Sequence, residues 1–489
     1  MSLAQKALGG FVWTFLDKFG SQGIQFLVLI VLARLLTPED FGLIAMLMVF
    51  FAFSQSLIDS GFSQALIREK SISEEDKATT FTVNITLAII MYLSLWFGAP
   101  YIANFFEEPR LIDLTKFMGL TLFFYSVTIV QRATFTQELR FKEQTFIQIL
   151  SSILTGIIAI ILAVLEFGVW ALAYNYVLLS LFSSLLFYYI NPWYPKLLFN
   201  KSSFDKLFGF GSKLMAVGLM SVLYQNIYKL IIGKLFAAAT LGFYTQAKNF
   251  KDAVTKHFNS TIQKVTYPIL SKTYESNEHL KNSTKKVLKV TSFLIFPMVI
   301  GLLLVAEPLI LVTVGEQWLE TVPILQLLCI SGLLYHIHSI NLNVLKVIGR
   351  SDLYLIAAVI RKINVAIVII VAILYGFWAL IIGQVISSYV SLFINMYYTS
   401  RTIKYTAKEQ LIDLIPILLL SLPMVGFVYG VSLIGFALPI LELLILVLTG
   451  VIVYGVTNLV FKHHSMVLLL NLLKPRIKFL EKYSSVWSG

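Results

Sequence analysis

Long apolar runs alternate with short polar breaks along the whole sequence. A run of about 20 apolar residues is long enough to cross the hydrocarbon core of a bilayer as an α-helix. The pattern predicts about fourteen such helices, at residues 8–35, 41–66, 80–105, 111–137, 145–165, 168–191, 207–235, 239–270, 286–313, 319–346, 351–374, 377–400, 411–433 and 438–461. We therefore predict an all-α, polytopic membrane protein.

Two polar segments add local detail. The first break, Leu36-Thr37-Pro38-Glu39-Asp40, places a capping threonine or aspartate beside a proline, which predicts a tight turn into the second helix. From Ser465 onward, the chain combines leucines with basic residues: Leu468, Leu469, Leu472 and Leu473 with Lys474, Arg476, Lys478 and Lys482. This tail is predicted to be a short basic amphipathic segment on the membrane surface.

Composition agrees with a membrane protein and excludes several functions. Hydrophobic residues make up 58% of the 489 positions and charged residues 13%, with a mean hydropathy of +0.82. Soluble domains carry about 25% charged residues. The single cysteine, Cys329, excludes a disulfide framework, a cysteine-rich zinc site and an iron–sulfur cluster.

The net charge of +12 is unevenly divided between the two predicted faces. If the N-terminus is cytoplasmic, the opposite face carries only Arg34, Arg110 and Lys234. The cytoplasmic loops then collect Arg68, Lys70, Lys77, Arg140, Lys142, Lys196, Lys201, Lys206, Lys281, Lys285, Lys286, Arg350, Arg401, Lys404 and Lys408. Basic residues near helix ends resist translocation, so both termini are predicted to be cytoplasmic. The same loops explain the basic excess, and nucleic acid is not an expected partner.

An internal repeat divides the chain. The segments 33–43 and 233–243 resemble each other at an offset of 200 residues, and 168–172 resembles 376–380 at an offset of 208. Both pairs lie at turns, which favours a duplicated six-helix unit whose copies run in the same direction. The predicted domains are a first lobe at 1–200, a second lobe at 201–405, two additional helices at 406–464 and the tail at 465–489.

Ionisable residues inside the predicted helices are candidates for function, because charge is costly in a bilayer. Asp17 and Lys18 lie in the first helix, and Lys229 lies in the seventh. The eighth helix is the most polar, and it includes Lys248, Lys251, Asp252 and Lys256. An amphipathic helix on the membrane surface is the alternative for that segment. The helix count, the charge orientation and the repeat favour a crossing helix that lines a wet, cationic cavity suited to phosphate.

Other charges and motifs leave less specific predictions. Arg132, Arg361 and Lys362 either line the path or pair within a lobe. His336 and His338 are two apart on a helix, so their side chains diverge by about 200° and do not bind one metal ion. There is no phosphate-binding loop for ATP and no catalytic constellation. We therefore expect no enzyme activity, no cofactor and no metal.

Several runs carry a family resemblance. They are 32–45 (LARLLTPEDFGLIA), 59–67 (DSGFSQALI), 208–213 (FGFGSK) and 232–236 (IGKLF). These runs resemble bacterial polysaccharide repeat-unit flippases of the multidrug/oligosaccharidyl-lipid/polysaccharide exporter superfamily. The similarity spans essentially the whole chain and is nearest to the colanic-acid and exopolysaccharide exporter branch.

The resemblance implies fourteen helices in two six-helix lobes plus two further helices, with alternating access to a central cavity. It implies a cargo of undecaprenyl-pyrophosphate-linked oligosaccharide, moved from the cytoplasmic to the periplasmic leaflet of a bacterial inner membrane. Related flippases for the peptidoglycan precursor use basic residues of the first and eighth helices near the diphosphate. Carried onto this sequence, those positions are Lys18, Lys248 and Lys251. Lysines stand here where some relatives have arginines. A lysine does not make the bidentate contact with phosphate that an arginine makes.

The sequence thus predicts a secondary flippase for exopolysaccharide or O-antigen synthesis. Lys229 and Lys256 are predicted as further substrate contacts, and Arg34 and Lys234 lie near the exit. Asp17 is the candidate for coupling to H⁺ or Na⁺. Membrane lipid, and a polymerase with its chain-length machinery, are the other expected partners. The alternatives are a cation-coupled multidrug exporter of the same fold, which should have an acidic cavity, and a membrane-embedded polymerase or ligase, which should have a large periplasmic loop.

Overall fold

The computed structural model describes residues 20, 22–69, 71–272, 274–461 and 466, but not the side chains of 256–265 and 269. Every regular element in these residues is helical, which confirms the predicted all-α class. The chain divides into two compact units, residues up to 245 and residues from 246 on. Apart from Met466, the predicted tail lies outside the described residues.

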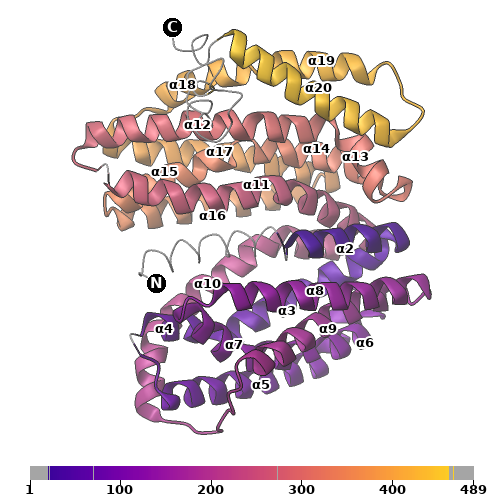
Figure 1. The fold of residues 1–489 in the computed structure, drawn as a ribbon, viewed down its shortest axis with the longest axis vertical. Helices are drawn as coiled ribbons and strands as arrows, with labels where there is room; N and C mark the ends of the chain where they lie inside the picture. Colours follow the sequence, from indigo (N-terminus) through magenta and orange to yellow (C-terminus); the bar gives the residue numbers. More distant parts are fainter. Residues whose placement is uncertain (1–19, 21, 70, 273, 462–465, 467–489) are drawn as a thin grey trace. The chain divides into compact units, whose positions relative to one another are not determined.

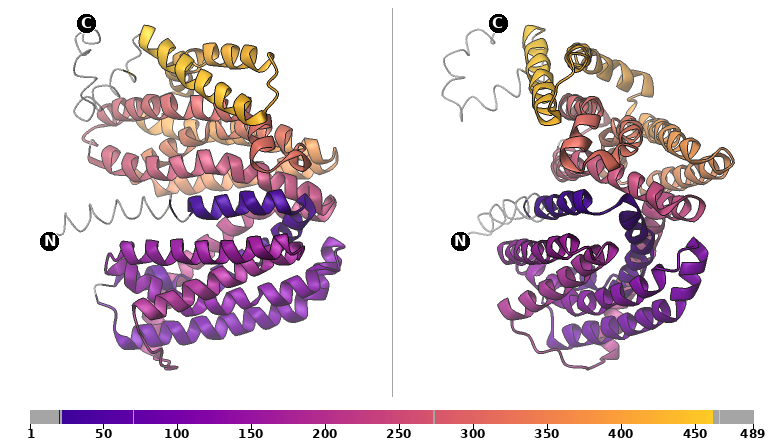
Figure 2. Two further views of the ribbon diagram at one scale, coloured as in Figure 1. Left: turned by 45° about the vertical axis from the view of Figure 1, so that its right-hand side comes forward. Right: turned by 90° about the vertical axis from the view of Figure 1, so that its right-hand side faces the viewer.

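The helices of the first unit follow the predicted apolar runs. They are α2 (Gln22–Leu35), α3 (Pro38–Asp59), α4 (Phe62–Arg68), α5 (Glu74–Phe106), α6 (Leu111–Met118), α7 (Leu120–Gln137), α8 (Phe141–Val164), α9 (Val169–Ile190), α10 (Lys201–Leu235) and the first turns of α11 (Ala238–Lys272) (Figure 1). Helices α8 and α9 lie side by side, and α10 packs against α3, α4 and α5 (Figure 2).

The predicted turn before the second span is confirmed. Thr37 is the N-cap of α3, and its Oγ1 accepts a hydrogen bond from the backbone N–H of Asp40 at 3.3 Å. The Asp40 carboxylate accepts in return from the backbone N–H of Thr37 at 3.0 Å, and Pro38 is the first helical residue. This capping box starts α3 with two residues intervening after the end of α2, because it satisfies backbone donors of the first turn locally.

The predicted helix at 41–66 is wrong in one respect, because the structure divides it into α3 and α4. Ser60 and Gly61 have φ values of +46° and +73° at the break. A Cβ atom at Gly61 would lie 2.3 Å from the backbone oxygen of Gly211 on α10. Both the left-handed conformation and this close approach require glycine at position 61.

The two copies of the first repeated motif contact each other within the first unit. A Cβ atom on Gly42 would lie 1.8 Å from the Ala238 oxygen, and a Cβ atom on Gly242 would lie 1.9 Å from the Pro38 oxygen. Position 38 corresponds to 238 and position 42 to 242, so the contact is reciprocal. We call these four residues the glycine crossing. The second motif also occupies equivalent places, because α9 begins at Val169 and α17 at Phe377. The lobe boundaries at 200 and 405 stay a prediction.

The second unit contains the remainder of α11 and the later helices. They are α12 (Asn277–Leu304), α13 (Ala306–Thr313), the short 3₁₀ helix η2 (Glu316–Trp318), α14 (Thr321–Gly332), α15 (Tyr335–Val347), α16 (Ser351–Ile373), α17 (Phe377–Ile403), α18 (Ala407–Leu419), α19 (Leu422–Ser432) and α20 (Pro439–Val460) (Figure 1). Three predicted single helices, at 286–313, 319–346 and 411–433, are each interrupted here, at 305, 333–334 and 420–421.

Twelve helices or helix pairs in the described part of the chain are long and apolar enough to cross a membrane. They match twelve of the predicted spans. The first predicted span, 8–35, lies outside the described residues up to position 19, and α2 is its described helix. The eighth coincides with α11, which is 35 residues long but is not among the twelve apolar spans. The protein is a multi-pass membrane protein, and the count of fourteen crossings stays a prediction.

Candidate functional site

The cations of α11 are the first part of the candidate site. Lys251 Nζ forms an ion pair with Asp252 Oδ1 at 2.7 Å, and the two side chains are 15% and 28% exposed. The stem of Lys251 lies against Gly332 of α14, since a Cβ atom there would be 3.4 Å from Lys251 Cδ. Lys248 is half-buried one turn earlier. Asp252 thus pairs with the residue that precedes it on the helix.

Some of the other predicted substrate contacts lie outside the described residues. Lys18 and the coupling candidate Asp17 lie outside the described residues, and so does the side chain of Lys256. Lys229 is half-buried on α10, and Arg34 is exposed in the last turn of α2. Because the structure describes each unit by itself, the convergence of Lys18 with Lys248 and Lys251 stays a prediction.

The predicted exit cation Lys234 is paired. Its Nζ lies 2.8 Å from Glu107 Oε1 and 5.4 Å from the centre of the Phe105 ring. The hydrogen bond from Lys234 lowers the pKa of the Glu107 carboxyl. Arg110 of the neighbouring turn contacts Glu39 and lies 3.0 Å from Glu108.

The ion pair of Lys234 with Glu107 lies at a small cavity at the end of α10. Its volume is about 270 Å³, and its lining includes Glu107, Glu108 and Lys234. The count of basic residues that oriented the chain did not include the acidic partners on this face. The signal for the missed partners was the acidic pair that directly follows the apolar run of α5.

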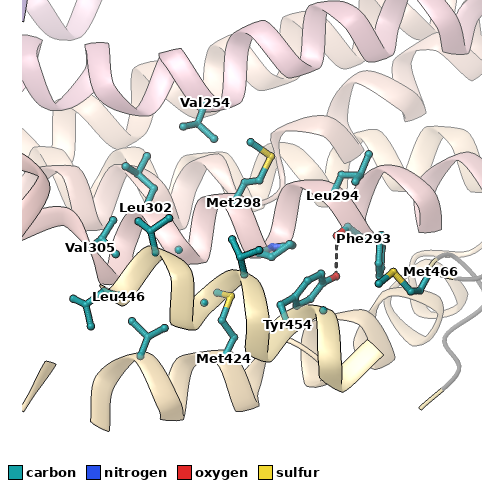
Figure 3. A pocket seen from close by; sticks show the side chains of 17 residues that line it. Val254, Phe293, Leu294, Met298, Leu302, Val305, Met424, Leu446, Tyr454 and Met466 are labelled. Atoms are coloured by element: carbon teal, nitrogen blue, oxygen red, sulfur yellow. Dashed lines mark hydrogen bonds between the residues drawn. The ribbon is translucent and has the colours of Figure 1, made fainter. Parts of the chain in front are cut away.

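A second missed feature is an apolar groove in the second unit, with a volume of about 540 Å³ (Figure 3). Its lining comes from α11, α12, α19 and α20, together with Val305 and Met466: Val254, Phe293, Leu294, Pro297, Met298, Gly301, Leu302, Val305, Met424, Val428, Leu446, Val447, Gly450, Val451, Tyr454, Gly455 and Met466. The only hydrogen bond drawn among them in Figure 3 runs from the Tyr454 hydroxyl to the Phe293 carbonyl oxygen, at 2.8 Å. Glycines on α12 and α20 are among these lining residues, and they leave room between the helices.

The two histidines of α15 face different helices, as their spacing predicts. His336 Nε2 lies 2.7 Å from Ser292 Oγ on α12, and His338 Nδ1 lies 3.0 Å from Asn395 Nδ2 on α17. Both rings are buried. Hydrogen bonds to neutral partners on separate helices make them parts of the packed core of this unit.

The three ambiguous cations have separate surroundings. Arg132 donates to Ser183 Oγ at 3.3 Å within the first unit. Arg361 on α16 donates to the Ala357 carbonyl oxygen of its own helix at 3.2 Å, and Lys362 beside it is half-buried.

Residues 31–323 match the protein family described as "Polysaccharide biosynthesis protein". The chain is 28% identical to the Lipopolysaccharide biosynthesis protein WzxC of Escherichia coli (strain K12), over 68% of this chain and 68% of that protein. It is 26% identical to the Teichuronic acid biosynthesis protein TuaB of Bacillus subtilis (strain 168), over 72% and 73%. It is 25% identical to the Succinoglycan biosynthesis transport protein ExoT of Rhizobium meliloti (strain 1021), over 72% and 71%.

Solved structures support the fold. The Lipid II flippase MurJ in an inward closed conformation aligns over 94% of this chain and 99% of its own, with a TM-score of 0.73 and 18% identity. An inward-facing multidrug resistance transporter of the MATE family aligns over 82% and 99%, with a TM-score of 0.60 and 17% identity. At these identities the likeness concerns architecture.

Proposed function

This chain belongs to the polysaccharide biosynthesis protein family, and on that premise we propose that it is a flippase for lipid-linked oligosaccharides. Its cargo is an undecaprenyl-pyrophosphate-linked repeat unit for exopolysaccharide or O-antigen synthesis. Transport runs from the cytoplasmic to the periplasmic leaflet of a bacterial inner membrane, with both termini cytoplasmic. The excess of basic residues on the loops assigned to the cytoplasm supports this orientation.

One observation in the second unit carries the proposal. Lys251 and Val254 lie three residues apart on α11, so they share a side of that helix. Lys251 is one of the described cations of α11, with Lys248, and Val254 lines the apolar groove. A lipid diphosphate needs both surfaces. Its anionic head group needs the cations, and its tail needs an apolar surface, where burial of each methylene contributes about 0.8 kcal/mol to the binding free energy.

Lysines suit the anionic end of such a cargo. A lysine ammonium binds phosphate as a point charge, and the attraction is stronger where water is excluded. We propose Lys18, Lys248 and Lys251 as the diphosphate contacts, with Lys229 and Lys256 next to them and Arg34 and Lys234 near the exit. The pair between Lys234 and Glu107 supports a gating role more than direct binding for Lys234.

The driving force is a separate part of the proposal. The sequence has no loop for binding ATP. The remaining sources are an H⁺ or Na⁺ gradient, with Asp17 as the coupling carboxylate, or consumption of the cargo by a polymerase in the outer leaflet. Indifference of flipping to imposed ion gradients in vesicles would leave consumption as the source.

The decisive experiment measures lipid-linked sugar in each leaflet of cells depleted of this protein. We expect accumulation in the cytoplasmic leaflet, relieved by the wild-type chain but not by the Lys18, Lys248 and Lys251 triple alanine variant at equal membrane levels. Unchanged leaflet distribution after depletion would reject the flippase proposal. Full relief by the triple variant would reject only the site assignment. Loss of the protein from the membrane would instead indicate structural pairing of the lysines.

A further inference from the structure

The ten-residue linker 191–200 joins two membrane spans, α9 and α10, so it lies at a membrane surface. The count of basic residues assigns this surface to the cytoplasm. Three consecutive apolar side chains of the linker, Leu197, Leu198 and Phe199, are 74%, 56% and 57% exposed. Apolar side chains that are exposed beside the ends of two spans suit contact with acyl chains. The expected neighbour of the linker is therefore phospholipid.

Local contacts hold the linker against the start of α5. The backbone N–H of Asn200 donates to Thr79 Oγ1 at 3.0 Å, and the Thr82 hydroxyl donates to a carbonyl oxygen of the linker at 3.0 Å. The Trp193 ring packs edge-on against Phe81, with the ring centres 5.9 Å apart. The linker and the first turns of α5 thus form one built surface.

A cavity of about 160 Å³ lies between the linker and α5. Its lining includes two carboxylates, two aromatic rings and one ammonium: Glu74, Glu75, Trp193, Tyr194 and Lys196. Trp193 Nε1 donates to Glu74 Oε2 at 2.9 Å, which holds one ring beside one carboxylate. The cavity therefore has room for a small polar group among both kinds of charge.

Two of the lining charges are not neutralised by a neighbour. Glu74 pairs with Lys77 at 2.8 Å. Among the described side chains, however, neither the Glu75 carboxylate nor the Lys196 ammonium has an oppositely charged group within 4.0 Å. Glu75 Oε2 accepts a hydrogen bond from Asn200 Nδ2 at 2.7 Å, and this neutral donor leaves the negative charge in place. Opposite charges that line one cavity without pairing can each contact one end of a zwitterion.

We propose that this cavity binds the head group of a phospholipid with a primary ammonium, phosphatidylethanolamine. The ammonium donates to Glu75, and the phosphate contacts Lys196. A primary ammonium has three donors for carboxylate oxygens, whereas the quaternary ammonium of choline has none. The rings of Trp193 and Tyr194 add cation–π attraction to the ammonium. The site is separate from the predicted cargo contacts, so this proposal goes beyond the proposed function and does not depend on it.

The test uses the full chain in a mild detergent. Native mass spectrometry counts bound phosphatidylethanolamine in competition with phosphatidylglycerol and phosphatidylcholine of the same acyl chains. We expect the wild type to prefer phosphatidylethanolamine. Glu75→Gln keeps an acceptor oxygen for Asn200 but removes the charge, and it should weaken binding of phosphatidylethanolamine roughly two- to fivefold, as for a solvent-exposed ion pair. Binding of phosphatidylglycerol should not weaken.

Two further variants separate the ends of the head group. Lys196→Gln should weaken binding of phosphatidylethanolamine and phosphatidylglycerol alike, because both lipids carry the phosphate. Glu75→Lys should reverse the preference toward phosphatidylglycerol, because it makes the cavity cationic. Asp205→Asn and Lys201→Gln are the matched controls. Each removes one exposed charge near the linker that does not line the cavity, so both should bind like the wild type.

Three results would overturn the proposal. The first is a wild type that binds phosphatidylethanolamine no better than phosphatidylglycerol, which would make the linker a general anchor for anionic lipid. The second is an equal loss of both lipids in Glu75→Gln. The third is the same effect in Glu75→Gln and Asp205→Asn, which would mean that net charge alone sets the preference. None of them bears on the flippase proposal, whose assay follows the cargo in each leaflet.

Discussion

Replacement of Gly42 by alanine tests the glycine crossing directly. The added Cβ atom would lie 1.8 Å from the backbone oxygen of Ala238 and 2.5 Å from its carbonyl carbon, whereas ordinary contact begins at 3.4 Å. The obstacle is backbone, so no side-chain rotation relieves it and the starts of α3 and α11 must separate. Overpacking of this kind costs about 1–3 kcal/mol. We therefore expect Gly42→Ala to unfold at a lower temperature than the wild type.

Gly98→Ala is the matched control, because nothing lies within 4 Å of a Cβ atom at that helical position. In an open helix interior, glycine to alanine gains about 0.5–1 kcal/mol. The two variants should thus shift the melting temperature in opposite directions when tryptophan fluorescence follows unfolding of the purified chain in nanodiscs. Equal shifts would refute the close contact. The double variant of Gly42 and Gly242 should cost less than the sum of the single changes, because the first change already separates the helices.

Three further predictions concern the ion pair, the topology and the groove. The pair with Lys234 lowers the pKa of Glu107, so its stabilisation is present above the unfolded pKa of about 4.3 and is lost as pH falls through the lower folded pKa. Lys234→Gln should therefore flatten the dependence of melting temperature on pH in the acid range, and an unchanged profile would argue against the pair. A reporter fused at Asn282 should read cytoplasmic, since a periplasmic signal would mean that α11 does not cross. Gly301→Leu should fill the apolar groove and slow export at normal protein levels, whereas Gly426→Leu, on the exposed side of α19, should not.

The parts of the fold that depend on local chemistry could be predicted from the sequence. The capping box at Thr37 acts within four residues, and the apolar runs that it separates are set by the thickness of the bilayer. Interruptions within runs could not be predicted in the same way. The break at Gly61 depends on the backbone of Gly211, which is distant in sequence.

The candidate site also has features that the sequence predicts and features that it does not. A polar helix among apolar ones is visible in the sequence, and the family resemblance singled out Lys248 and Lys251 on it. The partner of Asp252 was not visible, because neighbouring residues on a helix point about 100° apart and their pairing depends on side-chain conformation. An apolar groove is also invisible in a sequence, since residues that face lipid and residues that face a cavity have the same composition.

The glycine crossing has a consequence for how such a chain arose and how it can change. Position 38 of one repeat meets position 42 of the other, and the reverse contact is also made. This is the pattern of an isologous interface, in which two identical subunits use the same patch around a two-fold axis. A homodimer of a single six-helix ancestor could have made the same contact. After fusion of the two gene copies, the sequences on the two sides of the contact were free to differ. Pro38 and Ala238 now differ, while both glycines remain. Related chains should accordingly show correlated changes between position 42 and position 238, and between 242 and 38, but not between 42 and 242.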